Sequence, residues 1–247
     1  MNNLEIAALT DKYVARTYAR IPIALVRGKG TRVWDADGKE YLDFLAGIAV
    51  NSLGHCHPAI LRAIRQQSKT LLHVSNLYHI LPQSELAREL CNHSFADRVF
   101  FCNSGAEANE AAIKLVRRYG LEKLGGKYEI LSTHNSFHGR TLATLTATGQ
   151  EKIRAGYDPL PSGFRQVPYN DLAAVEEAID EKKTAAVLVE PIQAEGASTF
   201  RMTPTCEGCV SSATSEVSCS YSMKFKLGWG APARCSVTSI LLLNRTS

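Results

Sequence analysis

The sequence contains no apolar stretch long enough to cross a membrane. Its first residues, Met1 to Lys12, include Glu5 and Asp11 and lack the apolar core of a signal peptide. We therefore expect a cytoplasmic protein without a membrane partner. The seven cysteines are odd in number and do not form the disulfide framework of a secreted protein, so we expect reduced thiols.

Two further classes of protein lack support in the sequence. Lysine and arginine are not gathered into one basic run and the formal net charge is only +4, so we expect no nucleic-acid partner. No G-x-G-x-x-G opens a helical segment, which argues against a Rossmann nucleotide binder. The remaining composition, 45% hydrophobic and 21% charged over 247 residues, is ordinary for a globular protein with a sizeable core.

Residues that ligate metals come together at two places. His55-Cys56-His57 has no second pair of ligands near it, and Pro58 begins a helical pattern directly afterwards. Cys206 and Cys209 form one C-x-x-C without a second such pair or a pair of histidines. We predict no metal site at either place.

One stretch carries most of the functional information. A short apolar run at residues 99–101 is followed by the turn N-S-G and by a helical pattern that continues to Arg118. These patterns predict a strand, a tight turn and a helix. Ser104 and Glu107 fit a capping box, and Gly105 places no side chain before the helix start. Such a helix start binds phosphate, although an ordinary N-cap in an α/β protein has the same pattern.

Patterns elsewhere predict the remaining elements and the fold class. They are a β-hairpin of residues 31–34 and 41–44, helices over 58–73 and 82–91, a parallel strand over 128–131, a turn at 159–163, a helix from Asp171 to about Lys182, and a buried strand over 185–189. Because strands and helices alternate, we predict an α/β fold: a mostly parallel sheet flanked by helices, with ligands at the strand ends.

Three segments resemble one family. Residues 99–118 resemble the phosphate-binding helix of class III pyridoxal-phosphate aminotransferases, and S-T-H-N-S-F-H-G-R-T-L at 132–142 resembles that family's cofactor and substrate segment. E-P-I-Q-A-E-G at 190–196 resembles the family's E-P-I-Q-G-E-G, with Ala194 in place of glycine. The run through G-H-C-H-P at 54–58 is similar to acetylornithine and ornithine aminotransferases.

This resemblance covers about residues 14–196 and implies a fold and a domain organisation. The implied fold is that of a fold-type I pyridoxal-phosphate-dependent transferase, incomplete at the C-terminus. We expect residues 1–55 to form an N-terminal arm and part of a small domain, and residues 56–196 to form the first part of the large cofactor-binding domain. We expect residues 197–247 to form a poorly ordered tail that does not resemble the family. The family resemblance also implies a homodimer.

The same resemblance assigns site residues for pyridoxal 5'-phosphate and the substrate. The cofactor-binding residues it implies are Ser104, Gly105, Ala106, Phe137 and His138, with Phe137 stacking on the ring. Those it implies for the substrate are Arg140, Glu195 and Tyr18, and the guanidinium of Arg140 suits a carboxylate. Taken alone, Phe137 could instead be a core residue and Arg140 one half of a surface ion pair.

The implied activity is transfer of the δ-amino group of acetylornithine to 2-oxoglutarate, a step of arginine biosynthesis. Its small-molecule partners are an amino acid and a 2-oxo acid. Ornithine, succinylornithine and 4-aminobutyrate aminotransferases are alternatives within the family. A different alternative is a non-catalytic fragment that binds only phosphate or a partner subunit.

The sequence changes character beyond about Ala197. The final 51 residues contain ten serines, whereas the preceding 196 residues contain nine. The final 51 residues also contain four of the seven cysteines, but no aspartate and no histidine. A shifted reading frame accounts for this change. When the third base of each codon is read with the first two bases of the next, Met223-Lys224 encodes Glu. Residues 222–235 can then encode D-E-V-Q-T-G-M-G-R-T-G-A-L, which resembles the family's continuation. We hypothesise that one base was lost, or two gained, between about Ala197 and Met202.

This hypothesis has a consequence for catalysis. The family's aspartate beneath the pyridine nitrogen and its Schiff-base lysine both belong to the part of the pattern beyond the resemblance. The sequence as written supplies neither, so we assign no catalytic residue and expect this chain to be inactive. Lys224 and Lys226 lie in the shifted text and receive no role.

Overall fold

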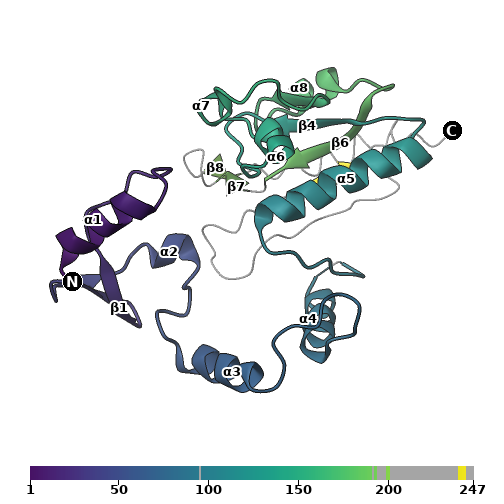
Figure 1. Ribbon diagram of the computed structural model, residues 1–247. Helices are drawn as coiled ribbons and strands as arrows, with labels where there is room; N and C mark the ends of the chain where they lie inside the picture. Colours follow the sequence, from purple (N-terminus) through teal and green to yellow (C-terminus); the bar gives the residue numbers. More distant parts are fainter. Residues whose placement is uncertain (95, 191, 194–198, 201–238, 243–247) are drawn as a thin grey trace. The chain divides into compact units, whose positions relative to one another are not determined.

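The chain forms two compact units, which are described separately here (Figure 1). The computed structural model describes residues 1–94, 96–190, 192–193, 199–200 and 239–242. The first unit holds residues 1–81 and the second holds the described residues that follow. Within these described residues, no helix is both long and apolar enough to span a bilayer. The domain boundaries expected from the sequence stay predictions.

The first unit combines helices with a three-stranded antiparallel sheet. Its helices are α1 (Asn3–Tyr13), α2 (Ala46–Ala49) and α3 (Pro58–Ser68), and its sheet has the order β1 (Leu25–Lys29), β2 (Arg32–Asp35) and β3 (Glu40–Leu42). β2 pairs with β3 around the turn that contains Gly38, so the predicted hairpin is confirmed.

A buried carboxylate ties α1 to this hairpin. Asp35 accepts hydrogen bonds from the Tyr41 hydroxyl at 2.7 Å and from the Asn3 side-chain amide at 3.1 Å. It also accepts from the backbone N–H groups of Lys39 and Asp37. These bonds, that of Tyr41 first among them, hold the pKa of Asp35 below its usual range.

The second unit is an α/β layer structure. Its helices are α4 (Leu81–Asn92), α5 (Gly105–Lys123), α6 (Leu142–Ala147), α7 (Glu151–Arg154) and α8 (Leu172–Ala178). Its main sheet has the order β5 (Phe164–Val167), β4 (Glu129–Thr133), β6 (Thr184–Val189) and β9 (Ser239–Leu242). A two-stranded pair, β7 (Ile192–Gln193) and β8 (Thr199–Phe200), follows β6. β4 runs parallel to β5 and β6, which confirms the predicted parallel sheet, whereas β9 is antiparallel to β6.

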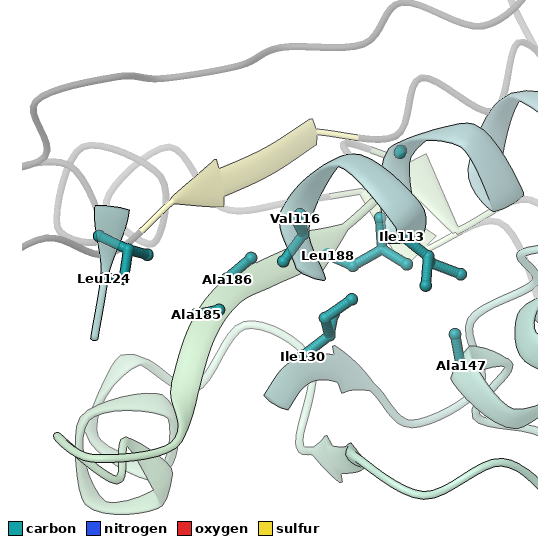
Figure 2. Packing of buried hydrophobic residues seen from close by; sticks show 9 residues of the cluster. Ile113, Val116, Leu124, Ile130, Ala147, Ala185, Ala186 and Leu188 are labelled. Carbon is teal, nitrogen blue, oxygen red and sulfur yellow. The ribbon is translucent and has the colours of Figure 1, made fainter. Parts of the chain in front are cut away.

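The two faces of this sheet have separate cores. On the face covered by α5, Ile113 and Val116 pack against Ile130, Ala186 and Leu188 (Figure 2). On the other face, Leu131 and Val187 pack with Val167 and with Val175 of α8. Because successive strand residues point to opposite faces, the adjacent apolar residues Ile130 and Leu131 of β4 and Val187 and Leu188 of β6 bury both faces.

One predicted strand is wrong. Residues 99–101 have no strand conformation and pair with no strand among the described residues, and Phe100 is 66% exposed. A β-strand depends on hydrogen bonds to a neighbour, so an apolar, β-prone run without a partner stays irregular.

Two predicted helices end earlier than expected. α8 ends at Ala178 because the Asp180 side chain accepts a hydrogen bond from the Lys182 backbone N–H at 2.8 Å and forms a turn there. α3 ends at Ser68, where the Thr70 hydroxyl donates to the carbonyl oxygen of Gln66. In both cases a polar side chain bonds backbone groups at the helix end, which a period-based prediction does not register.

Candidate functional site

The first turn of α5 is capped as the sequence predicts, with one difference. The Ser104 hydroxyl accepts a hydrogen bond from the Glu107 backbone N–H at 3.2 Å, so the N-cap is confirmed. The Glu107 carboxylate, however, accepts from the backbone N–H and side-chain amide of Asn103 rather than from the backbone of Ser104. These bonds, the Asn103 side-chain amide first, lower the pKa of Glu107.

The space in front of this helix start is open. A Cβ atom placed on Gly105 would have no heavy atom within 4 Å, and Gly105 is exposed. Among the described residues, no hydrogen-bond acceptor faces the backbone N–H of Gly105 or of Ala106. The N-terminal end of the 19-residue helix α5 thus offers unsatisfied donors and a positive dipole end to an anion.

The loop that follows β4 lies directly against this turn. Gly139 has a φ of +132°, and a Cβ atom on it would lie 3.0 Å from the Ala106 Cβ and 2.6 Å from the Thr144 Oγ1. A side chain is therefore excluded at Gly139 both by backbone conformation and by space. Glycine here allows residues 137–140 to approach α5 closely.

Hydrogen bonds to the main chain of His138 fix the same loop. The Asn109 side-chain amide of α5 donates to the His138 carbonyl oxygen at 2.7 Å, and the His138 N–H donates to the Thr148 hydroxyl at 3.0 Å. The His138 side chain is 2% exposed, and neither ring nitrogen has a partner among the described residues. Burial lowers the pKa of His138 to about 3, so the ring is neutral.

The end of β6 is joined to this loop as well. The Glu190 carboxylate accepts a hydrogen bond from the Phe137 N–H at 3.2 Å, and the Glu190 carbonyl oxygen accepts from the Tyr169 hydroxyl at 2.9 Å. The Gln193 side-chain amide donates to the Thr133 hydroxyl and to the His134 carbonyl oxygen, each at 2.9 Å. The N-terminal part of α5, residues 133–140, Glu190 and Gln193 therefore form one network at the carboxyl ends of β4 and β6.

The structure brings most of the expected cofactor-site residues into this network. Phe137 is half-buried, and Arg140 is exposed and has no ion-pair partner among the residues described. Tyr18 lies in the first unit with 64% of its surface exposed. Glu195 lies outside the described residues. The ligand roles of all these residues stay predictions.

Both histidines of the H-C-H run are engaged by protein groups. The His55 Nε2 atom lies 2.7 Å from the Asp43 carboxylate, which lowers the pKa of Asp43. The His57 side chain accepts from the Ala59 N–H at 3.3 Å and caps α3. No group of three metal-ligating side chains occurs among the described residues.

Sequence reasoning missed several residues that build the network. Asn109 and Thr148 carry no local signal, because their partners lie 29 and 10 residues away in the chain. Gly139 belongs to the H-G-R run, but nothing in that run indicates its close approach to α5. Glu190 and Gln193 belong to the E-P-I-Q motif, whose spacing could have marked them as groups at the end of a strand.

Solved structures with this arrangement define the class of protein. The chain is similar to the ornithine aminotransferase of Toxoplasma gondii, with a TM-score of 0.81 and 31% identity over 87% of this chain and 52% of that one. It is also similar to the acetylornithine aminotransferase of Elizabethkingia anophelis, with a TM-score of 0.70 and 30% identity over 87% and 51% of the two chains. The fold is that of a fold-type I pyridoxal-phosphate-dependent transferase.

Sequence comparison narrows the class to a family. The aminotransferase class-III family model matches residues 13–208, and the chain belongs to that family. It is 59% identical over 186 residues to the acetylornithine aminotransferase of Caldanaerobacter subterraneus subsp. tengcongensis, and 55% identical over 189 residues to that of Methanocaldococcus jannaschii. These matches cover 75% and 76% of this chain but 47% of each relative. The chain thus spans about half the length of the curated relatives it matches.

Class III aminotransferases depend on pyridoxal phosphate, and the described residues fit one end of that cofactor. The open first turn of α5 suits its phosphate, because the unsatisfied N–H groups and the empty space at Gly105 meet there.

Proposed function

We propose that this chain provides the phosphate- and ring-binding part of an aminotransferase that transfers the δ-amino group of acetylornithine to 2-oxoglutarate, in arginine biosynthesis. The observation that carries the proposal is the single network of the N-terminal part of α5, residues 133–140, Glu190 and Gln193. The names of the relatives, acetylornithine aminotransferases at 55–59% identity, support the choice of substrate.

Each residue of the proposed site has a distinct task. The N–H groups of Gly105 and Ala106, with the Ser104 hydroxyl, bind the phosphate group, and Phe137 covers the ring. Arg140, exposed and free of an ion pair among the described residues, binds the carboxylate of the substrate through its planar guanidinium. When bound, pyridoxal phosphate supplies an electron-accepting ring beside the substrate amine.

We extend the proposal to His138, Glu195 and Tyr18. His138 lies between Phe137 and Gly139 and completes the cofactor segment. Glu195 and Tyr18 contact the substrate or Arg140 by the family resemblance. We propose that residues 1–196 bind cofactor and substrate without turnover, because no residue in this part resembles the family's catalytic lysine.

A second substrate has some support. The fold similarity to the Toxoplasma gondii ornithine aminotransferase, at a TM-score of 0.81, favours ornithine as an alternative amino donor. Both donors carry the reacting amine at the same carbon, so the residues described here would serve either.

The Gly105→Val variant tests the proposed phosphate site. Its Cβ atom would have no heavy atom within 4 Å and its side chain would enter the open space before α5, so we expect the fold to be retained while a ligand phosphate is displaced. We expect binding of pyridoxal 5'-phosphate, measured by equilibrium dialysis, to weaken at least about tenfold, a loss of roughly 1.4 kcal/mol.

The control for this test is Leu121→Val, an exposed change near the opposite end of the same helix. It should leave both the fold and the binding unaltered. Equal affinity of the Gly105→Val variant and the unaltered chain would contradict the phosphate site. Inorganic phosphate that competes with the cofactor for the unaltered chain would support it.

We also propose a second copy of this chain as its macromolecular partner. None of the described side chains between residues 42 and 81 is buried, and Phe44, Leu72 and Leu77 are 94%, 83% and 85% exposed. So much apolar surface in one segment is typical of an interface.

Charge placed in this segment should disrupt self-association. We expect Phe44→Glu with Leu77→Glu to raise the dissociation constant at least about tenfold in sedimentation equilibrium, because each carboxylate would have to be desolvated in the interface. Leu4→Glu, at a residue of α1 that is 75% exposed, is the matched control and should not change it. A monomeric unaltered chain would refute the proposal.

A further inference from the structure

The His138 side chain is fully enclosed in the network. Among the described residues, none donates a hydrogen bond to its two ring nitrogens or accepts one from them. Its ring is 2% exposed, and both Nδ1 and Nε2 are without hydrogen bonds there. The main chain of the same residue is fully engaged, through Asn109 at 2.7 Å and Thr148 at 3.0 Å. The backbone of His138 is therefore held while its imidazole occupies a space that offers it no polar contact.

No hydrogen-bond acceptor among the described residues contacts either ring nitrogen, so a proton gained by the ring would have no direct partner. α6 contains no charged residue, the charged residues in the first two turns of α5 are Glu107 and Glu110, Glu190 follows β6, and Arg140 belongs to the loop itself. Each carboxylate accepts hydrogen bonds from other groups: Glu107 from Asn103, Glu110 from Thr141, and Glu190 from the Phe137 N–H.

The loop packs closely on α5 and α6. A Cβ atom on Gly139 would lie 2.6 Å from the Thr144 Oγ1 and 3.0 Å from the Ala106 Cβ, so no side chain separates the loop from these helices at this position. Movement of residues 137–140 away from the two helices would expose the imidazole to water, and it would break the Asn109 and Thr148 hydrogen bonds.

We propose that His138 is a positioning residue: its neutral ring, enclosed beside α5 and α6, keeps the loop of Phe137 and Arg140 docked, and its protonation releases that loop. The part of the inference that concerns ligands rests on the proposed function, because Phe137 and Arg140 are its ring-binding and carboxylate-binding residues. The docking itself does not depend on any ligand.

The direction and size of the pH effect follow from the two states of the loop. The docked state holds His138 neutral down to about pH 3, whereas a solvated histidine binds its proton near pH 6.5. Acid therefore favours the released loop: docking is fully stable above about pH 6.5 and is lost progressively as the pH falls toward 3. Between pH 7.5 and 5.5 the opening equilibrium should rise about tenfold.

Hydrogen exchange of the 247-residue chain tests this without any ligand. We expect the amide protection factors of a peptide spanning residues 135–142 to fall about tenfold between pH 7.5 and 5.5. His138→Asn and His138→Phe should show no such fall, because neither side chain titrates. His134→Asn is the matched control, since His134 is an exposed histidine of the same loop, and it should keep the tenfold fall.

The His138→Phe variant also separates positioning from an ordinary polar role. Replacing an unpartnered polar ring by an apolar ring of similar shape should leave protection at pH 7.5 equal or higher. A protection factor that does not change with pH in the unaltered chain would overturn the proposal, as would a tenfold fall that persists in both His138 variants.

A measurement on the unaltered chain guards against variants that fail to fold. In an NMR titration, the His138 ring should stay neutral to pH 5, and a His138 signal that titrates near pH 6.5 overturns the proposal. The proposed function is judged separately, by binding of pyridoxal 5'-phosphate at pH 7.5. Absence of binding with an intact pH effect would refute the function and leave the docking role of His138 standing.

Discussion

Replacing Leu188 with alanine should lower the free energy of unfolding of the second unit by about 2–5 kcal/mol. Leu188 lies in β6, between β4 and β9, and its side chain is completely buried. It belongs to the cluster of Ile113, Val116 and Ile130 through which α5 packs on the sheet (Figure 2). Its truncation removes apolar contacts and leaves a cavity that the surrounding strands cannot fill.

The loss of stability should be measured at the backbone amides of β6 itself. Hydrogen exchange of amides in residues 184–189, followed in urea, gives the free energy of the opening that exposes the strand. Leu121→Ala, a truncation of the same size at a residue of α5 that is 67% exposed, should stay within about 0.5 kcal/mol of the unaltered chain. A Leu188→Ala loss below about 1 kcal/mol would mean that α5 and the sheet do not share one core.

The site should lose its geometry together with this core. α5 begins at the proposed phosphate-binding turn and runs across the face that Leu188 supports, so the position of Gly105 relative to residues 137–140 depends on that packing. We infer that cofactor binding and the stability of β6 are coupled. Replacing Val175 of α8 with alanine would instead act on the opposite face of the sheet, away from the first turn of α5.

Local chemistry explains which parts of this arrangement were predictable. The Ser104 cap and the Asp171 cap are set by side chains that bond backbone N–H groups three residues away, so the sequence reveals them directly. The parallel strands β4 and β6 were predictable because short groups of adjacent apolar residues between helical segments are typical of buried parallel strands. The start of α5 and its place in the fold needed no knowledge of distant residues.

Long-range interactions explain what could not be predicted. The run at residues 99–101 has the composition of a strand but finds no strand to pair with, and composition cannot report a neighbour. The bond from Asn109 to His138 joins residues 29 positions apart, so neither residue signals it. The burial of His138 follows from that docking and is likewise invisible in the motif. Motif resemblance identified the segment, but the structure was needed to show what holds it.

The largest effect should come from restoring the reading frame. Insertion of one base between the codons of Ala197 and Met202 should give a longer protein that continues with the D-E-V-Q-T-G-M-G-R-T-G-A-L text. We expect its transamination of acetylornithine with 2-oxoglutarate to exceed that of the 247-residue chain at least about 10³-fold, because a lysine nucleophile and a carboxylate at the pyridine nitrogen become available.

Mass spectrometry of the protein from its natural source tests the same hypothesis independently of activity. An intact mass well above 27.0 kDa, with peptides of the shifted text, would establish the frame-restored protein as the natural one. A mass of 27.0 kDa, with peptides containing Cys206 and Cys209, would refute the frameshift hypothesis and identify a natural chain with the final 51 residues as written. In that case the Gly105→Val test still applies, because the proposed phosphate-binding turn, the His138 loop and β6 all precede residue 197. The two tests are therefore independent: the Gly105→Val variant tests the proposed binding of the cofactor, and restoration of the reading frame tests catalysis.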